Sequence, residues 1–174
     1  MTLQIEGLTK RFGAHTLFRG LELRVEGPAV LWAPSGWGKT TLLRILMGLE
    51  RPDAGSVTGV GRVAAVFQED RLCPQLTAVE NVLLVLPDGR ARRGGVEADF
   101  ARLGMTGDAL TLPAARLSGG QKRRAALLRA VWARADTRLF DEPFTGLDPA
   151  AMEQAAALLR ARCAGAPALL ATHD

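Results

Sequence analysis

Hydrophobic and polar residues alternate along the first thirty positions, as expected of β-strands that are buried on one face only. The alternation is clearest at residues 3–6 and 21–25, and Phe12-Gly13 marks a turn between the two strands. A short apolar run at residues 29–32 is consistent with a buried strand. This strand leads directly into the Gly-rich segment 33–41.

The pattern changes to helical spacing after this segment. Leucine and isoleucine residues between positions 42 and 46 fall on one helix face, and Gly48 ends the predicted helix. Turn-forming residues follow at 51–55, and a further strand is predicted at 62–67.

Helical periodicity dominates from Thr77 to about residue 135. Thr77 is suited to be an N-cap, with Glu80 completing a capping box. The Gly- and Arg-rich stretch 88–95 predicts an exposed loop. Strands return at 138–141 and 168–171, with a helix between them that Asp148 and Pro149 open. Alternating strands and helices around a helical insert predict an α/β fold with a mainly parallel sheet.

The composition is that of an ordinary globular domain. The chain has 174 residues, 48% hydrophobic and 23% charged, a size that needs no disulfide or metal to stabilise a core. No apolar run reaches the length of a membrane span, and the first residues do not form a signal peptide. Cys73 and Cys163 are isolated, which fits a reducing compartment. The net charge of +4 comes from scattered Arg residues, so nucleic acid is not an expected partner.

Candidate chemistry begins in the Gly-rich segment, where Gly36, Gly38, Lys39 and Thr40 lie between a strand and a helix. Glycines allow backbone N–H groups to surround phosphate oxygens, and the helix N-terminus adds a positive dipole end. Lys39 would reach the β- and γ-phosphates, and the Thr40 hydroxyl would bind Mg²⁺. An ordinary Gly-rich turn is the alternative. Ala33 replaces the first Gly of the strict phosphate-loop pattern, at a cost of about 1 kcal/mol if the position requires positive φ.

The segment Leu117–Gln121 reads Leu-Ser-Gly-Gly-Gln and identifies the family. Ser118 and Gln121 form a capping box, and a capped helix whose free N–H groups point outward can also bind an anion. With this motif, the chain resembles the ATP-binding cassette (ABC) ATPases. In that family the motif of one subunit closes over the γ-phosphate held by the phosphate loop of another.

The same resemblance assigns roles to five other residues. Gln68 resembles the Gln that reaches Mg²⁺ and the attacking water, and Asp141 and Glu142 resemble the acidic pair that holds hydrated Mg²⁺ and activates the water. His173 resembles the histidine that contacts the γ-phosphate. Phe12 matches the aromatic residue that stacks on adenine, although a buried anchor is the alternative for this side chain.

The resemblance therefore implies ATP and Mg²⁺ as cofactors and a defined set of site residues. The catalytic residues are Gln68, Glu142 and His173, and the metal ligands are Thr40, Gln68 and Asp141. The expected nucleotide contacts are Phe12, Ser35, Gly36, Trp37, Gly38, Lys39, Thr40, Thr41, Ser118, Gly119, Gly120 and Gln121.

The implied fold is a P-loop NTPase (RecA-like) core with an N-terminal antiparallel β subdomain and an inserted helical subdomain. Residues 1–69 and 136–174 would form the nucleotide-binding core, and residues 70–135 the helical subdomain with the Leu117–Gln121 motif. Trp37 departs from the family pattern, because it places a bulky ring in the phosphate loop that either shades the nucleotide or points outward. The chain also stops one residue after His173, so the C-terminal part of the usual domain is expected to be absent.

Coupled transport is the leading functional hypothesis. The resemblance implies an ATP-hydrolysing subunit that forms an ATP-sandwich dimer, cytoplasmic and peripheral at the inner face of the cell membrane. It would power separate permease subunits, with a solute-binding protein involved indirectly. Residues 69–82 look like those of bacterial nitrate, sulfonate and taurine importers, with Gln75 in place of a common Trp. The alternatives are a soluble ABC-type ATPase acting on DNA or ribosomes, and a regulatory nucleotide-binding subunit without turnover.

Overall fold

The structure is a computed structural model that describes residues 2–173 and divides the chain into two units. The first unit consists of Met1–Ala65, Ala135–Glu142 and Cys163–Asp174. The second unit consists of Val66–Arg134 and Pro143–Arg162.

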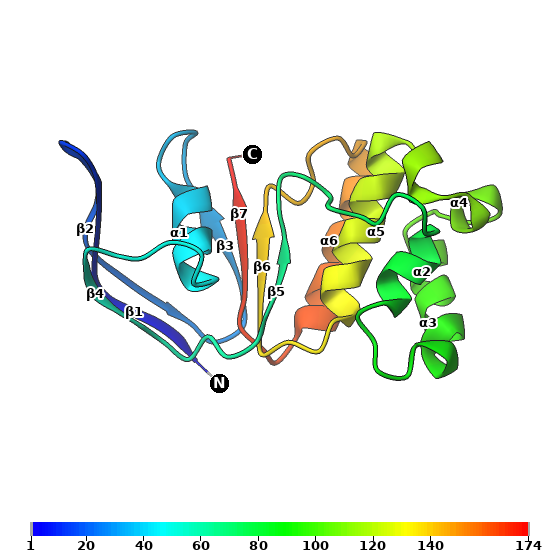
Figure 1. Ribbon diagram of the computed structural model, residues 1–174, viewed down its shortest axis with the longest axis horizontal. Coiled ribbons are helices and arrows are strands. Elements are labelled where there is room, and N and C mark those ends of the chain that lie inside the picture. The colour runs from blue at the N-terminus through cyan, green and yellow to red at the C-terminus, as the bar shows by residue number, and fades with distance from the viewer. Residues whose placement is uncertain (1, 174) are drawn as a thin grey trace. The chain divides into compact units, whose positions relative to one another are not determined.

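An antiparallel sheet opens the first unit (Figure 1). Its strands are β1 (Leu3–Phe12), β2 (His15–Val25) and β4 (Ala54–Thr58), in the order β2-β1-β4. Phe12 pairs with His15, so β1 and β2 form a tight hairpin at the predicted turn. The turn predicted at 51–55 is shorter than expected, because its last two residues already belong to β4.

A second sheet carries the parallel strands that the sequence predicts, but the predicted burial of residues 29–32 is wrong. Their strand lies at the edge of the described sheet, with Val30 65% and Trp32 66% exposed. It consists of β3 (Pro28–Trp32), β7 (Ala168–Thr172), β6 (Thr137–Asp141) and β5 (Val63–Val66), in the order β3-β7-β6-β5. Both β3 and β6 run parallel to β7, with Asp141 of β6 opposite Ala171 of β7. The predicted α/β fold with a mainly parallel sheet and an N-terminal antiparallel sheet is confirmed.

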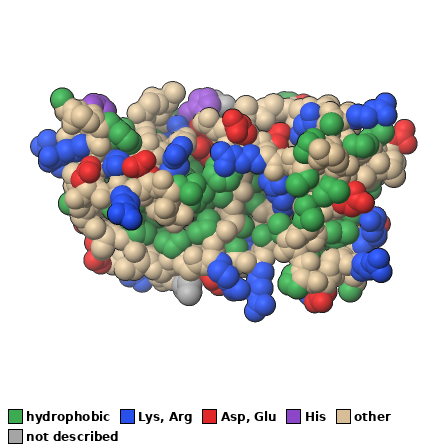
Figure 2. Space-filling model, in the orientation of Figure 1, with side chains coloured by type: hydrophobic (Ala, Val, Ile, Leu, Met, Phe, Trp, Pro, Cys, Tyr) green, Lys and Arg blue, Asp and Glu red, His purple; other side chains and the backbone are tan. Residues whose placement is uncertain are grey.

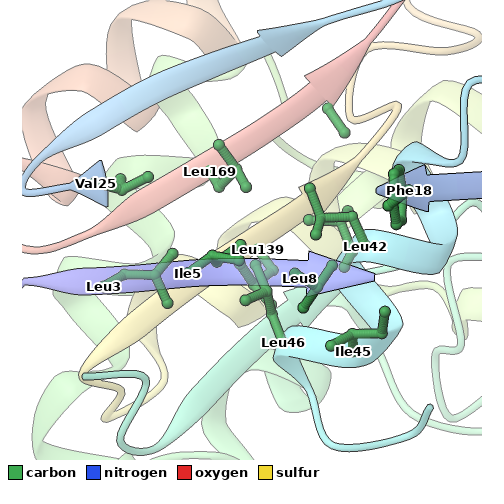
Figure 3. Close-up of a cluster of buried hydrophobic side chains, with 12 residues drawn as sticks. Leu3, Ile5, Leu8, Phe18, Val25, Leu42, Ile45, Leu46, Leu139 and Leu169 are labelled. Atoms are coloured by element: carbon green, nitrogen blue, oxygen red, sulfur yellow. The ribbon is translucent and has the colours of Figure 1, made fainter. Parts of the chain in front are cut away.

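The core of the first unit forms around α1 (Lys39–Leu46), which packs against β6 and β7. Helix α1 contributes four buried aliphatic residues at the spacing that the sequence predicts. Figure 3 shows three of them, Leu42, Ile45 and Leu46, among side chains of β1, β6 and β7. This packing fixes the start of α1 next to the ends of two parallel strands.

The second unit is helical. Its helices are α2 (Ala78–Leu83), α3 (Gly89–Arg102), α4 (Asp108–Thr111), α5 (Gly119–Trp132) and α6 (Pro149–Cys163), with a 3₁₀ turn at Ala114–Arg116. Helix α2 contacts α3, α4 and α5, and α3 also contacts α5. The predicted capping box of α2 is present, because the Thr77 hydroxyl accepts from Glu80 N and the Glu80 carboxylate accepts from Thr77 N.

Helix α3 corrects the prediction of an exposed loop at 88–95. Most of that stretch is the first half of a 14-residue helix. Gly94, Gly95 and the arginines of this stretch are exposed, which explains why the composition resembles that of a loop. The helix is anchored by Val96, Asp99 and Phe100, each 0% exposed. Tertiary contacts at one end therefore override the weak helix propensity of the other.

Two surface properties complete the fold. Within residues 2–173, no helix combines the length and apolarity needed to cross a membrane. On the face shown in Figure 2, Lys and Arg side chains lie in separate groups with Asp and Glu among them.

Candidate functional site

The phosphate loop connects β3 to α1, and Gly38 is the N-cap of that helix. Gly38 has φ 102°, and a Cβ atom there would lie 2.7 Å from Leu17 Cδ2 and 2.8 Å from Phe18 Cζ. Both the backbone conformation and the close packing therefore require glycine at this position. Gly36 also has positive φ, and both Gly36 and Ser35 are exposed. The first N–H groups of α1 have no partner within the helix, so the loop and helix start can bind an anion.

The two unusual residues of this loop are accommodated without strain. Ala33 is 5% exposed and does not have positive φ, so the expected cost of replacing Gly does not arise. Trp37 packs on Phe18 with ring centroids 5.2 Å apart, and it joins the core of the first unit. This contact anchors the loop on β2, so the ring does not simply point outward, whereas a contact of the half-buried ring with the nucleotide stays a prediction.

Lys39 extends into the loop and is 7% exposed. Its Nζ donates to the carbonyl of Ala33 at 2.7 Å and to that of Pro34 at 3.3 Å. The same ammonium lies 3.5 Å from Glu142 Oε1. A cation is thus held where the loop meets the end of β6, which suits a phosphate carrying several negative charges.

Thr40 and Asp141 form the second contact between α1 and β6. The Thr40 hydroxyl donates to Asp141 Oδ2 at 2.7 Å, and Asp141 is 4% exposed. A hydroxyl and a carboxylate side by side are the hard oxygen donors that Mg²⁺ prefers. The residues present therefore fit the expected metal. Thr41, the next residue of α1, is half-buried.

Glu142 directly follows β6 and is held in a strained conformation. Its φ is 46°, a region that a side chain of this kind rarely adopts. His173 Nδ1 lies 2.8 Å from Oε1, and the Thr172 hydroxyl donates to Oε2 at 3.1 Å. Burial raises the pKa of Glu142, but the hydrogen bonds from His173 and Thr172 and the charges of His173 and Lys39 outweigh it and lower the pKa. Glu142 is therefore an ionised acceptor at neutral pH.

Thr172 is a site residue that sequence reasoning missed. Because β6 and β7 are parallel with Asp141 opposite Ala171, the next residues, Glu142 and Thr172, also lie side by side. The sequence contained the signal, since both strand ends were predicted and the carboxyl ends of parallel strands meet at one edge.

Phe12 lies at the end of β1 with half of its surface exposed. Lys10 Nζ lies 4.9 Å from the ring centroid and is itself held by Glu50 at 2.7 Å and by the Arg51 carbonyl at 2.8 Å. The alternative of a buried anchor is wrong. The exposed ring can stack on a flat heteroaromatic base.

The helical unit carries the remaining candidates. Gln68 follows β5 and is exposed. Ser118 is the N-cap of α5, and the predicted capping box is present: Gln121 N donates to Ser118 Oγ at 3.3 Å, and Ser118 N donates to Gln121 Oε1 at 2.9 Å. A Cβ atom at Gly119 would meet nothing within 4 Å. The start of α5 is thus open at Gly119, whereas a Cβ atom at Gly120 would lie 3.3 Å from the Gly146 carbonyl oxygen. The first N–H groups of the helix have no partner within it, so this end can bind an anion.

The structure therefore brings Lys39, Thr40, Asp141, Glu142 and His173 together in the first unit, through the contacts given above. Gln68 and the residues 118–121 belong to the second unit. Asp148, also in the second unit, has the capping role that its position predicts, because Ala151 N donates to its carboxylate at 2.9 Å.

Comparisons with known proteins agree with the resemblance seen in the motifs. The profile of a family described as "ABC transporter" matches residues 21–145. The aliphatic sulfonates import ATP-binding protein SsuB 1 of Nocardia farcinica is 45% identical over 150 residues, covering 85% of this chain and 61% of that protein. SsuB 1 of Pseudomonas syringae pv. syringae is 39% identical, covering 95% of this chain and 71% of that protein. The chain spans about 60% of the length of several such relatives.

Solved structures show the same fold. A dimeric structure of MJ0796, described as a bacterial ABC transporter cassette, aligns with a TM-score of 0.81 at 25% identity, covering 99% of this chain and 88% of that chain. A post-hydrolysis state of the same cassette, bound to ADP and Pi, aligns with a TM-score of 0.82 at 27% identity, with the same coverage.

Proposed function

Because the chain belongs to the ABC transporter family, we propose that it is an ATP-binding and ATP-hydrolysing subunit of an importer. The observation that carries this proposal is the cluster of Lys39, Thr40, Asp141 and Glu142 at the start of α1 and the end of β6. These residues place a cation, two metal-binding oxygens and an ionised carboxylate around one anion-binding loop.

The side chains have distinct roles in this proposal. Lys39 and the N–H groups of α1 bind the β- and γ-phosphates, and the exposed ring of Phe12 supports adenine. Thr40 and Asp141 would hold Mg²⁺, and the resemblance to the family implies Gln68 as an additional ligand. When bound, Mg²⁺ neutralises charge on the phosphates.

Glu142 orients the attacking water and accepts its proton as the oxygen bonds to the γ-phosphorus. The bond from that phosphorus to ADP then breaks, releasing ADP and inorganic phosphate. His173 and Thr172 hold the Glu142 carboxylate in place. His173 also has an exposed side chain, so it can turn towards the γ-phosphate.

We further propose that two copies sandwich ATP, with Ser118, Gly119, Gly120 and Gln121 of one copy facing the γ-phosphate held by the other. The open N-terminus of α5 supports this arrangement. The dimeric cassette that this chain resembles supports it as well.

The relatives' names support aliphatic sulfonates as the imported class. As the resemblance to ABC importers implies, the proposed partners are permease subunits at the inner face of the membrane and, indirectly, a solute-binding protein. They favour transport over an ATPase that acts on DNA or ribosomes. Uptake of a labelled alkanesulfonate by cells that depend on this chain tests the assignment. Loss of uptake with Glu142→Gln is expected, and unchanged uptake would contradict it.

Two substitutions test the ATPase proposal directly. Lys39→Ala is expected to abolish ATP binding, whereas Glu142→Gln should bind ATP, stop turnover and accumulate a dimer. Arg44→Ala is the matched control, because Arg44 is an exposed residue in the last turn of the same helix. Calorimetry measures binding, phosphate release measures turnover and analytical ultracentrifugation measures the dimer. Retained micromolar binding by Lys39→Ala, or wild-type turnover by Glu142→Gln, would refute the assigned roles.

A further inference from the structure

A buried arginine of α5 has no role in the function described so far. Arg123 is 3% exposed and lies just beyond the Leu117–Gln121 motif, in the first half of the same helix. Burying a guanidinium group is costly unless hydrogen-bond acceptors surround it. The identity of these acceptors therefore indicates what the residue does.

The acceptors come from two separate segments of the second unit. Arg123 Nη1 donates to the carbonyls of Phe67 at 2.6 Å and Gln68 at 3.3 Å, and it lies 3.2 Å from Asp70 Oδ1. Arg123 Nε donates to the carbonyl of Pro143 at 3.0 Å. One side chain thus joins α5 to the segment of Gln68 and to the residue that follows Glu142.

Both segments depend on side chains for their shape. Residues 67–70 and 143 lie outside helices and strands, so their carbonyls are not part of a regular hydrogen-bond ladder. Arg129, also in α5, extends the same support, because it donates to the carbonyls of Asp70 at 2.9 Å and Arg71 at 2.7 Å. Helix α5 therefore holds the backbone from 67 to 71 through two arginines.

We propose that Arg123 is a positioning residue that couples the Leu117–Gln121 motif to Gln68 and to the chain after Glu142. The inference rests on the proposed ATPase function. Arg123 touches neither nucleotide nor water in this proposal. It makes Gln68 and Pro143 move together with α5, so that docking of the α5 N-terminus on a phosphate also sets the position of Gln68. A guanidinium suits this role because its rigid fork of donors reaches several acceptors in fixed directions, which an ammonium cannot do.

Arg123→Met removes the donors and keeps much of the apolar stem. The matched control is Arg162→Met, which removes an arginine of the same unit whose guanidinium binds the buried Asp99 carboxylate at 2.6 Å. Within residues 2–173, Arg162 contacts Asp99 and the Trp132 ring, and neither belongs to a motif. Asp70→Asn removes the charge of the ion pair with Arg123 and leaves the backbone carbonyls that Arg123 contacts unchanged. It therefore distinguishes the effect of the ion pair from that of the carbonyl hydrogen bonds.

Two measurements on the whole chain test the coupling. At saturating ATP, Arg123→Met is expected to lower kcat by about tenfold or more, as displaced catalytic groups do, while the Kd for ATP changes less than about threefold. Arg162→Met and Asp70→Asn should stay near the wild-type kcat. Hydrogen exchange of the amides at 67–71 should accelerate in Arg123→Met and not in Arg162→Met.

The exchange measurement separates the two proposals, because it needs no turnover. If the wild-type chain hydrolyses no ATP, the proposed function fails, and faster exchange at 67–71 still supports the coupling. Unchanged exchange there overturns the inference, as does a wild-type kcat in folded Arg123→Met. If Arg123→Met does not fold, Arg123→Lys takes its place, and a wild-type kcat together with unchanged exchange overturns the inference in the same way.

Discussion

Two adjacent glycines of α3, Gly94 and Gly95, make a matched pair for testing how this helix is stabilised. Both are exposed positions in the helix interior, and neither has positive φ. They differ in their surroundings. A Cβ atom at Gly94 would meet nothing within 4 Å, whereas one at Gly95 would lie 3.0 Å from Trp132 Cη2 and 3.5 Å from Cζ2.

The expected effects of alanine therefore diverge. Replacing an interior helical Gly by Ala stabilises a helix by about 1 kcal/mol, and Gly94→Ala should raise the free energy of unfolding by this whole amount. Gly95→Ala gains the same propensity but presses on the Trp132 ring. That ring cannot move freely, because its Nε1 donates to Asp99 at 3.0 Å and the Arg162 guanidinium lies 4.9 Å from its centroid. Overpacking of this kind costs about 1–3 kcal/mol, so Gly95→Ala should be neutral or destabilising.

Urea unfolding followed by far-UV circular dichroism measures the difference. In thermal unfolding of a chain of this size, the free-energy gain of Gly94→Ala corresponds to an increase in Tm of about 2–4 °C. Hydrogen exchange of the α3 amides shows whether the gain is local to the helix. Equal effects of the two substitutions would refute the argument from Trp132, and destabilisation by Gly94→Ala would refute the argument from propensity.

Three further outcomes are expected. The pKa of Glu142 is lowered in the folded chain, so its contribution to stability is present above about pH 4.5 and is lost as the pH falls through the folded pKa. The urea midpoint of Glu142→Gln should therefore fall less steeply on acidification than the urea midpoint of the wild type. Asn81→Ala should cost about 2–3 kcal/mol in urea unfolding, because the fully buried Asn81 amide bonds both the N–H and the carbonyl of Cys73 and two further carbonyls; a loss below 0.5 kcal/mol would contradict this. Phe12→Ala should weaken ATP binding, measured by calorimetry, by about tenfold because base stacking is lost, whereas Phe12→Tyr keeps the ring and should bind as the wild type does. Equal ATP affinities of Phe12→Ala and the wild type would contradict the stacking role.

Features that depend on neighbouring residues were predictable from the sequence. The strand, glycine loop and helix from 29 to 46 follow one another with little room for alternatives, and the capping boxes at Thr77 and Ser118 are set within four residues. The strand pattern likewise predicts that Asp141 and Glu142 lie at the carboxyl end of β6. Local chemistry dictates these elements, so a single sequence contains the necessary information.

Features that depend on distant residues were not predictable in this way. Helix α3 is specified by what Asp99 and Phe100 contact, and its own first half has poor helix propensity. Trp37 is placed by Phe18, a residue of another strand. Arg123 looks like one more cation in a basic helix until the carbonyls around it are known. In each case the deciding partner is separated along the chain.

The position of Glu142 shows how the register between two strands can place a candidate catalytic carboxylate. A left-handed φ at a non-glycine residue costs about 1–3 kcal/mol and persists only where its surroundings compensate. Here the compensation comes from β7: Glu142 N donates to the Ala171 carbonyl at 2.9 Å, and Thr172 and His173 hold the carboxylate. A slip of one residue between β6 and β7 would place Thr172 beside Asp141 and leave the strained residue without these partners. The parallel pairing that buries the core of the first unit is therefore the same pairing that aims the carboxylate at the phosphate loop.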